Sequence, residues 1–475
     1  MAKVYTGTYG KDTTDETALV TNLLKYPEIG KKIISQYPRF SLTYLLEAAG
    51  RNAAEKVIGD YAFEWKMMGR YRKPCTIHTS TGGATGAVSA GSTFTLTFTH
   101  DTANGTYGNN LNVNDVVRMP SGNTAIVTDA GTPGAASNVV TFRAIDAINE
   151  TTADGDVIGC IGNAFNQGSL GAEVGQNYAY PDTYKNWLTL SRKKTKIMGT
   201  DLTDVTWIES NGHRLWYFTK EQQMTDQFMY ELELQRWYGK KSSNMTSASY
   251  PGDTGLDTGE FVSGVPIMGD GLLAQIDGAN QATYTAGALT EEDIVNFIGT
   301  LSKNALNAEG NVFTVFTGTQ GRIDFHRAMK DLLVTLGSGT PVFAGKGGGD
   351  VALGANFQEY NVLGNKMILS YCPVFDDPNL HNSISSTFDT SNESGKMVFI
   401  DMGIQNGVSN VELIAKGAEG FNRSFVKKYV PGMVNPYDYN SMMAANGDDF
   451  FECQILSESG IILRNPLSCG ILSNS

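Results

Sequence analysis

The sequence has no apolar run of about 18 residues, the length that a membrane-spanning helix needs. Its first 17 residues are polar and mixed in charge, and they lack the apolar centre of an export signal. We therefore expect neither a membrane span nor export. At 475 residues the chain is long enough for two to four domains.

Cysteine is scarce and scattered. The five residues are Cys75, Cys160, Cys372, Cys453 and Cys469. No two of them have the C-x-x-C spacing of a zinc site or a redox pair. Cys75 and Cys160 flank one segment and could meet in space, but an odd, dispersed set favours free thiols in a reducing cytosol.

Positive charge is also in short supply. Lys and Arg number 36 against 49 Asp and Glu, so the net charge is −13. This balance argues against a sequence-independent grip on nucleic acid or on an anionic membrane. Glycine is abundant at 53 residues while charged residues make up 18%. That combination favours turns and strands over long solvated helices.

The region 75–165 differs from its surroundings, since no lysine occurs between Lys73 and Lys185. Thr, Gly, Ala and Val dominate it. Five strand candidates, at 94–99, 113–119, 125–128, 139–145 and 157–161, are separated by the turn pairs Asn104-Gly105, Ser121-Gly122 and Asp154-Gly155. The pattern predicts a small β-sandwich or barrel, inserted between two flanking segments.

The flanking segments are strand-like. Residues 61–67 alternate, with Tyr61, Phe63, Trp65 and Met67 on one side. Their basic end (Arg70, Arg72, Lys73) has a counterpart in Arg192, Lys193, Lys194 and Lys196, beside Trp187, Leu188 and Leu190. We predict that the two segments pair as a long arm. The basic cluster is either solvated or reaches an acidic neighbouring subunit, and we favour the second because an isolated hairpin is marginal in water.

Four helices are predicted, and three of them begin with a cap or a capping box. The first runs from an N-cap at Ser41 to Gly50. The second covers 219–238 and opens with a capping box at 219–222. Its apolar residues lie on two sides, with Met224, Phe228 and Leu232 opposite Tyr230, Leu234 and Trp237. A helix of this kind is buried between layers, so we interpret it as a structural spine.

The third helix opens with a capping box, Thr290 to Asp293, and Ile294, Phe297, Ile298, Leu301 and Ala305 form its buried face. A strand at 312–317 and a helix at 323–333, with Phe325, Met329, Leu332 and Leu333 inward, follow. Further strands are predicted at 366–371, 397–401, 411–415 and 450–456. Helices and strands mix without strict alternation, so the predicted class is α+β.

The sequence contains no complete motif of an enzyme active site. A Gly-rich stretch, 339–349, fails as a phosphate loop, because five residues separate Gly339 from Gly345-Lys346 and Gly347 replaces the Ser or Thr that binds magnesium. The histidines are dispersed: His78, His100, His213, His326 and His381. Asp376-Asp377-Pro378 fits a turn better than a cation site. We predict no catalytic, cofactor-binding or metal site, although paired carboxylates could be neither chosen nor dismissed among 49 acidic residues.

The order of arm, hairpin, capped helix and α/β portion is similar to the Hong Kong 97-type capsid fold. In detail, Asn186-Trp187-Leu188-Thr189-Leu190 through Gly199-Thr200-Asp201, and Trp216-Tyr217-Phe218-Thr219-Lys220-Glu221-Gln222 into Glu231-Leu232-Glu233, resemble major capsid proteins of crAss-like phages of gut Bacteroidales. The resemblance implies an N-terminal arm (1–60), an E-loop (61–74 and 166–206), the β-rich insertion domain (75–165), a P-domain with the spine helix (207–289), an A-domain (290–425) and a C-terminal return (426–475).

The resemblance also implies a function. The chain would be a virion protein that catalyses nothing and assembles with itself into hexamers and pentamers in the host bacterial cytoplasm. The shell would enclose double-stranded DNA without sequence-specific binding. Portal, scaffold and decoration or head-fibre proteins would be its other partners, with no membrane and no cofactor. No Lys–Asn crosslinking pair is identifiable. The alternatives are a tail or fibre protein, and a cytosolic carbohydrate-active enzyme.

Overall fold

The computed structural model describes residues 41–48, 56–67, 74–77, 87–98, 111–131, 138–149, 152–153, 155–168, 181–200, 205–210, 213–242, 267–276, 280–285, 287–304, 311–335, 359–377, 380, 393–405, 407–418, 420–437, 444 and 447–474. The chain forms two compact units. Unit 1 comprises Met1–Trp65 and Thr183–Ser475, and unit 2 comprises Lys66–Asp182.

Unit 2 contains a small β-barrel. Its strands are β3 (Pro74–Thr76), β5 (Thr93–Phe98), β6 (Asp115–Arg118), β7 (Thr124–Asp129), β8 (Asn138–Ala144) and β10 (Val157–Asn163), in the order β3-β10-β6-β7-β8-β5. A bridge between Ile77 and Phe98 joins the two ends of this order and closes the sheet. The predicted strands are thus confirmed. The short strands β4 (Ala87–Val88) and β9 (Ile148–Asn149) pair beside it.

The barrel has its own apolar core. Phe142 is fully buried, with Phe94 stacked on one side and Phe98 edge-on at 6.1 Å. The predicted turn at Ser121-Gly122 joins β6 to β7, and Gly122 has φ +101°, a conformation that favours glycine. The turn pair Asn104-Gly105, and Asp154 of the third pair, lie outside the described residues.

One sheet of unit 1 has the order β15-β26-β19-β16-β18-β17. Its strands are Gln281–Tyr284, Gly470–Asn474, Met397–Asp401, Val312–Thr317, Asn365–Tyr371 and Glu359–Val362 in that order. Helices α5 (Glu291–Asn304) and α6 (Thr319–Thr335) pack on it. The Thr290 capping box is confirmed, because Thr290 and Asp293 exchange hydrogen bonds. Ile294, Phe297, Ile298, Leu301 and Phe325 are buried as predicted. Ala305 and the side chains of Met329, Leu332 and Leu333 lie outside the described residues.

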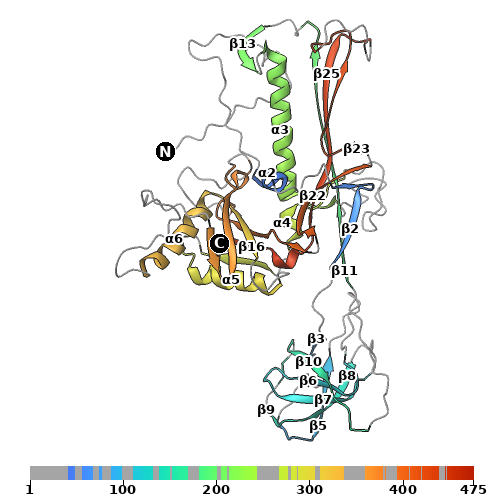
Figure 1. Cartoon of the computed structure of the whole chain (residues 1–475), viewed down its shortest axis with the longest axis vertical. Coiled ribbons are helices and arrows are strands. Elements are labelled where there is room, and N and C mark those ends of the chain that lie inside the picture. Colours follow the sequence, from blue (N-terminus) through green and yellow to red (C-terminus); the bar gives the residue numbers. More distant parts are fainter. Residues whose placement is uncertain are drawn as a thin grey trace. The chain divides into compact units, whose positions relative to one another are not determined.

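The other large sheet of unit 1 is built around β25 (Phe450–Leu463), which is longer than predicted. Along one edge β25 pairs with β12 (Thr189–Met198), and along the other with β24 (Val426–Pro431) and then β22 (Val411–Ala418). Strands β1 (Val57–Ile58) and β23 (Phe421–Asn422) pair with β22. The helix α3 (Trp216–Tyr238) runs alongside this sheet (Figure 1).

The predicted arm needs a correction. Strand β2 (Ala62–Met67) pairs with β11 (Asp182–Trp187), but the basic run that contains Arg192 lies in β12 and pairs with β25 instead. The reason is hydrophobic, since Ile197 on β12 is 1% exposed and lies against the α3 side of the sheet. The other half of the predicted basic cluster, Arg70, Arg72 and Lys73, lies outside the described residues.

Helix α3 starts three residues earlier than predicted. Strand β14 (His213–Leu215), which pairs with β13 (Val205–Ser210), leads directly into Trp216. Thr219 therefore lies inside the helix and cannot be its N-cap. The predicted burial on both sides is confirmed: Met224, Phe228, Leu232 and Trp237 are buried, and Tyr230 and Leu234 are partly buried.

The short helix α2 (Ser41–Ala48) is capped from another helix. The backbone N–H groups of Leu42 and Thr43 donate to the Glu233 carboxylate of α3, at 2.9 and 3.2 Å. Ser41, the predicted N-cap, is the first helical residue, and Gly50 lies outside the described residues. A negative charge at a helix N-terminus is favourable, so Glu233 replaces a local cap.

The remaining elements are connectors. They are α4 (Leu272–Gln275), the 3₁₀ helices η6 (Pro373–Asp376) and η7 (Pro466–Ser468), and the hairpin of β20 (Ile404–Gln405) with β21 (Val408–Ser409). After α3 the chain crosses itself closely at Gly239 and Gly271, whose backbones share a 2.9 Å hydrogen bond. A Cβ on Gly271 would lie 2.7 Å from the Gly239 nitrogen, so the crossing requires glycine.

Candidate assembly surfaces

A buried carboxylate fastens α3 to β24. Glu221, which is 7% exposed, forms an ion pair with Lys427 and accepts hydrogen bonds from the hydroxyls of Tyr429, at 2.6 Å, and Tyr437. Burial alone raises the pKa of Glu221, but the donors Lys427, Tyr429 and Tyr437 outweigh it and lower the pKa below 4.5. Helix α3 and strand β24 are therefore joined by a charged contact in which both oxygens of the Glu221 carboxylate have a partner.

This contact makes stability depend on pH in a defined direction. The folded pKa of Glu221 is lowered, so its contribution is full above pH 4.5 and is lost as pH falls through the folded value. We expect Glu221→Gln to reduce the free energy of unfolding by about 1–3 kcal/mol at neutral pH, and by less in acid. Denaturant titrations at several pH values measure this difference.

The double variant Glu221→Gln/Lys427→Met is the control, because it removes the partly buried cation together with its partner. It should lose less stability than Glu221→Gln alone. Equal losses in the two variants, or a loss that does not shrink in acid, would contradict the ion-pair account.

Exposed apolar side chains follow the same strand. The rings of Tyr429 and Tyr437 lie 4.8 Å apart and remain 40% and 46% exposed. Phe425 and Met433, just before and just after β24, are 40% and 70% exposed. A row of large apolar side chains left open to water is typical of a surface that another protein covers. We define Phe425, Tyr429, Met433 and Tyr437 as the β24 row.

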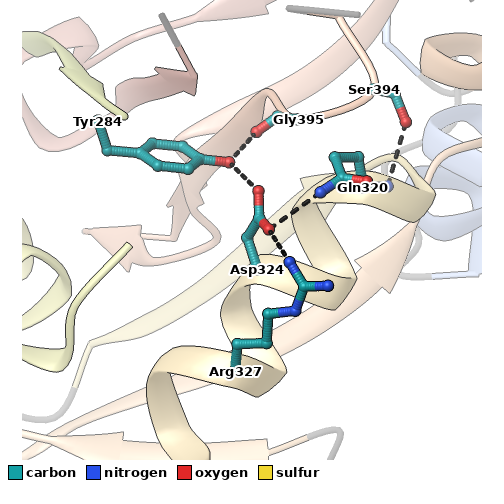
Figure 2. A network of polar contacts seen from close by, with 6 residues as sticks. All are labelled: Tyr284, Gln320, Asp324, Arg327, Ser394 and Gly395. Carbon is teal, nitrogen blue, oxygen red and sulfur yellow. Dashed lines mark hydrogen bonds and ion pairs between the residues drawn. The ribbon is translucent and has the colours of Figure 1, made fainter. Parts of the chain in front are cut away.

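A second polar network holds the other sheet of unit 1 together (Figure 2). The side chain of Asp324 on α6 is fully buried and lies 3.0 Å from Gln320 Nε2 and 3.6 Å from Arg327. The hydroxyl of Tyr284 on β15 lies within hydrogen-bonding distance of Asp324, at 3.2 Å, and of the Gly395 carbonyl, at 2.8 Å. Burial, and then the Asp324 charge, raise the pKa of Tyr284. The network is structural, since each of its groups is satisfied by another.

We expect Tyr284→Phe to lower the free energy of unfolding by about 1–2 kcal/mol, because Asp324 and the Gly395 carbonyl then share the loss of one donor. Equilibrium denaturation measures the change. In an Asp324→Asn background the same substitution should cost less, since the charged acceptor is already gone. An undiminished cost in that background would show that the hydroxyl does not act through Asp324.

The Asp376-Asp377 pair acts as a cap. The backbone N–H and the hydroxyl of Thr319, at the start of α6, donate to Asp376 at 2.8 and 2.6 Å. Tyr230 on α3 donates to Asp377. The predicted turn is present, since the Leu380 N–H donates to the Asp377 carbonyl at 3.2 Å, and Asp376 in addition caps a distant helix. Pro378 lies outside the described residues.

Of the remaining candidates, the structure describes His213 and His326. His326 lies on α6, where burial and then nearby Arg322 lower its pKa. His213 lies in β14, whereas His78, His100, His381 and the stretch 339–349 lie outside the described residues. Among the residues that the structure describes, no three His, Cys, Asp or Glu side chains gather as metal ligands. None of the five cysteines, all described, is in a disulfide.

A small pocket lies between α3 and β25 in unit 1. Trp187, Gln235, Arg236, Asp270 and Ser459 are among its lining residues. Its volume is about 10 Å³, which holds one water molecule at most. Within the described ranges, no helix combines the length and the apolar character that crossing a membrane requires.

Comparison with known proteins decides the assignment. A family model described as the Crassvirus major capsid protein matches residues 162–475, well over half of the chain. The chain belongs to this family. Membership confirms the resemblance drawn from the sequence, and with it the Hong Kong 97-type α+β fold that the resemblance implied. This capsid protein is a structural component of the virion and forms its head shell. Its match begins in β10, so most of unit 2 lies outside the family model.

No curated protein matches the chain. Among solved structures it is similar to Mycobacterium phage Bobi (9% identity, 96% of this chain and 97% of that chain, TM-score 0.35). It is also similar to Mycobacterium phage Patience (7%, 66% and 78%, 0.36) and to an encapsulin complex from Synechococcus elongatus (11%, 62% and 75%, 0.31). The family match, rather than these similarities, carries the assignment.

Sequence reasoning missed the two carboxylates that matter most here. Glu221 and Glu233 lie on α3, and the sequence predicted burial for neither, since Glu221 was placed only within the capping box at 219–222. A signal was present, because a helix with apolar residues on two sides leaves little room for solvated charges. The acidic residues between those apolar positions had to be buried with partners.

Proposed function

We propose that this capsid protein closes into hexamers and pentamers that together enclose phage double-stranded DNA without reading its sequence. The observation that carries the proposal is the β24 row, which leaves four large apolar side chains open to water on a single copy. Heterologous contacts between identical copies generate closed rings, and each ring would cover these side chains with a neighbour.

The domain roles follow the same logic. We assign 1–60 to an N-terminal arm, 61–74 and 166–206 to the E-loop, 75–165 to an insertion domain, 207–289 to the P-domain, 290–425 to the A-domain and 426–475 to the return. Two features support this assignment: β2 and β11, which flank the barrel in the sequence, pair with each other, and α3 is buried on both sides. Within 166–206, β11 pairs with β2, whereas β12 pairs with β25.

We propose no catalytic role. Assembly would take place in the host bacterial cytoplasm, where free thiols persist. Portal, scaffold and decoration or head-fibre proteins are the further partners we expect. A tail or fibre protein does not fit the family to which the chain belongs.

Expression of the full chain, alone and with its neighbouring virion genes, tests the proposal. Electron microscopy and sedimentation velocity should detect closed shells and capsomers. The substitution Met433→Ser, at the most exposed member of the β24 row, should lower the yield of shells while the protein still melts cooperatively. A chain that stays monomeric at high concentration in every coexpression, or that turns over a carbohydrate substrate, would contradict the proposal.

A further inference from the structure

The sheet that contains β12, β25 and β24 has two different faces. On β12, Ser191 and Lys193 contact Gln235 and Glu231 of α3, so they lie on the face toward the helix. Side chains alternate along a strand, and Arg192, Lys194 and Lys196 therefore lie on the opposite face. On β24, Lys427 pairs with Glu221 of α3, which places Lys428 on the opposite face as well.

The basic side chains on the two faces of the sheet differ in their ion-pair partners. Lys193 and Lys427, toward α3, are each neutralised by a carboxylate, Glu231 and Glu221. The four on the opposite face are all exposed: Arg192, Lys194, Lys196 and Lys428. Among the described residues no acidic side chain forms an ion pair with them. We call these four residues the basic face.

The four charges are close together. Lys194 and Lys428 both lie opposite Gln454 of β25, so they share one cross-strand row. With about 3.4 Å per residue and 4.8 Å between strands, the four Cα atoms span roughly 14 by 10 Å. The single carboxylate in these rows, Glu452, is 9% exposed and accepts a hydrogen bond from Gln454. The basic face thus carries four cations against one carboxylate, with Lys196 over the Phe450 ring at 3.5 Å, on a chain of net charge −13.

The same chain carries the complementary charge in residues 75–182, the part of unit 2 that follows the basic residues Lys66, Arg70, Arg72 and Lys73. From Cys75 to Asp182 there are nine acidic residues against two basic ones, Arg118 and Arg143. Asp129 and Asp146 are exposed on the barrel and accept hydrogen bonds only from neutral donors, Gly131 and Thr124. Their charges are therefore available to a partner.

We propose that the acidic barrel region, residues 75–182, of a second copy docks on the basic face. This inference rests on the proposed self-assembly and names the partner surfaces within it. Complementary charges set which surfaces meet and in which register, and like charges elsewhere on two acidic copies oppose wrong contacts. Packaged DNA is the rival occupant, but the acidic charge of the whole chain disfavours it.

Zero-length crosslinking tests the occupant directly. Shells assembled from an equal mixture of unlabelled and ¹⁵N-labelled full-length chains are treated with a water-soluble carbodiimide, which joins contacting carboxylates to lysines. Mass spectrometry should find Lys194 or Lys428 linked to acidic residues of 75–182, in peptides that mix the two labels. Links from these lysines only to acids elsewhere, or none in assembled shells, would overturn the proposal. So would protection of both lysines in DNA-filled but not in empty shells, which would assign the face to DNA.

Charge reversal supplies the second arm. Lys194→Glu/Lys428→Glu should lower the yield of shells at least about tenfold, since like charges across an interface repel. The neutral variant Lys194→Gln/Lys428→Gln should lower the yield of shells less than the charge reversal does. It should also make that yield depend less on salt concentration. Asp129→Lys/Asp146→Lys, combined with the charge reversal, should restore shells. Lys240→Glu/Lys303→Glu, with the same charge change at exposed sites off the basic face, is the matched control.

The outcomes separate the two proposals. A wild-type chain that never assembles would defeat the proposed function. Wild-type and charge-reversed chains that assemble equally well would defeat only the docking inference. Melting curves identify any variant that fails to fold. If the charge-reversed variant fails to fold, the neutral variant Lys194→Gln/Lys428→Gln and the crosslinks test the docking inference.

Discussion

Replacing Trp237 with alanine is expected to lower the free energy of unfolding of unit 1 by about 3–5 kcal/mol. The indole is fully buried and meets Phe316 of β16 and Phe375 of η6 edge-on, at 5.2 and 5.1 Å. Its ring nitrogen also donates to Glu233 at 3.3 Å. The substitution would leave a cavity at the point where α3 joins the two sheets of unit 1.

Denaturant unfolding followed by circular dichroism measures this loss. Trp237→Phe is the matched control, because it keeps an aromatic ring in contact with Phe316 and Phe375 and should cost about half as much or less. A loss below about 1 kcal/mol for Trp237→Ala would mean that α3 is not held between the layers as described.

Glu233→Gln is expected to cost about 3–5 kcal/mol, the range found when one member of a buried charged contact is removed. The carboxylate is 0% exposed and accepts from the backbone of Leu42 and Thr43, the Thr43 hydroxyl and the Trp237 indole. An amide offers one acceptor oxygen and brings two donors. At least one N–H at the start of α2 therefore loses its partner.

Glu231→Gln, two residues away on the same helix, is the control. Glu231 is 42% exposed and pairs with Lys193 at 2.6 Å, so its loss should cost at most about 1 kcal/mol. Hydrogen exchange should additionally show faster exchange in α2 for Glu233→Gln alone. Unchanged protection of α2 would mean that Glu233 does not cap it.

Local pattern was enough to place many of the longer elements of the fold. The alternation at 61–67, the barrel strands and the capping box at Thr290 each depend on neighbouring residues, and each is found as predicted. The partner of β12 could not be predicted in this way. β25 begins some 250 residues later, and several alternating segments compete for it. The burial of Ile197 and Phe451 against α3 decides the pairing.

Helix capping is a second feature that local sequence pattern did not predict correctly. Ser41 is a good N-cap by residue type, yet Glu233 takes its place because α3 brings a carboxylate to the start of α2. The capping box at Thr219 fails because β14 runs on into the helix. Likewise Glu221 owes its partners to β24 and to the segment that carries Tyr437, more than 200 residues away. Such contacts depend on tertiary structure, which a local pattern does not contain.

Strands β25 and β26 have one further consequence, for the timing of folding. β25 pairs with β12, β22 and β24, and β26 pairs with β15 and β19, all of which precede them in the chain. Neither sheet of unit 1 can therefore be completed until the ribosome has made residues 450–474. A prematurely terminated chain would keep open strand edges in both sheets, and proteases would remove it before it could enter a growing shell.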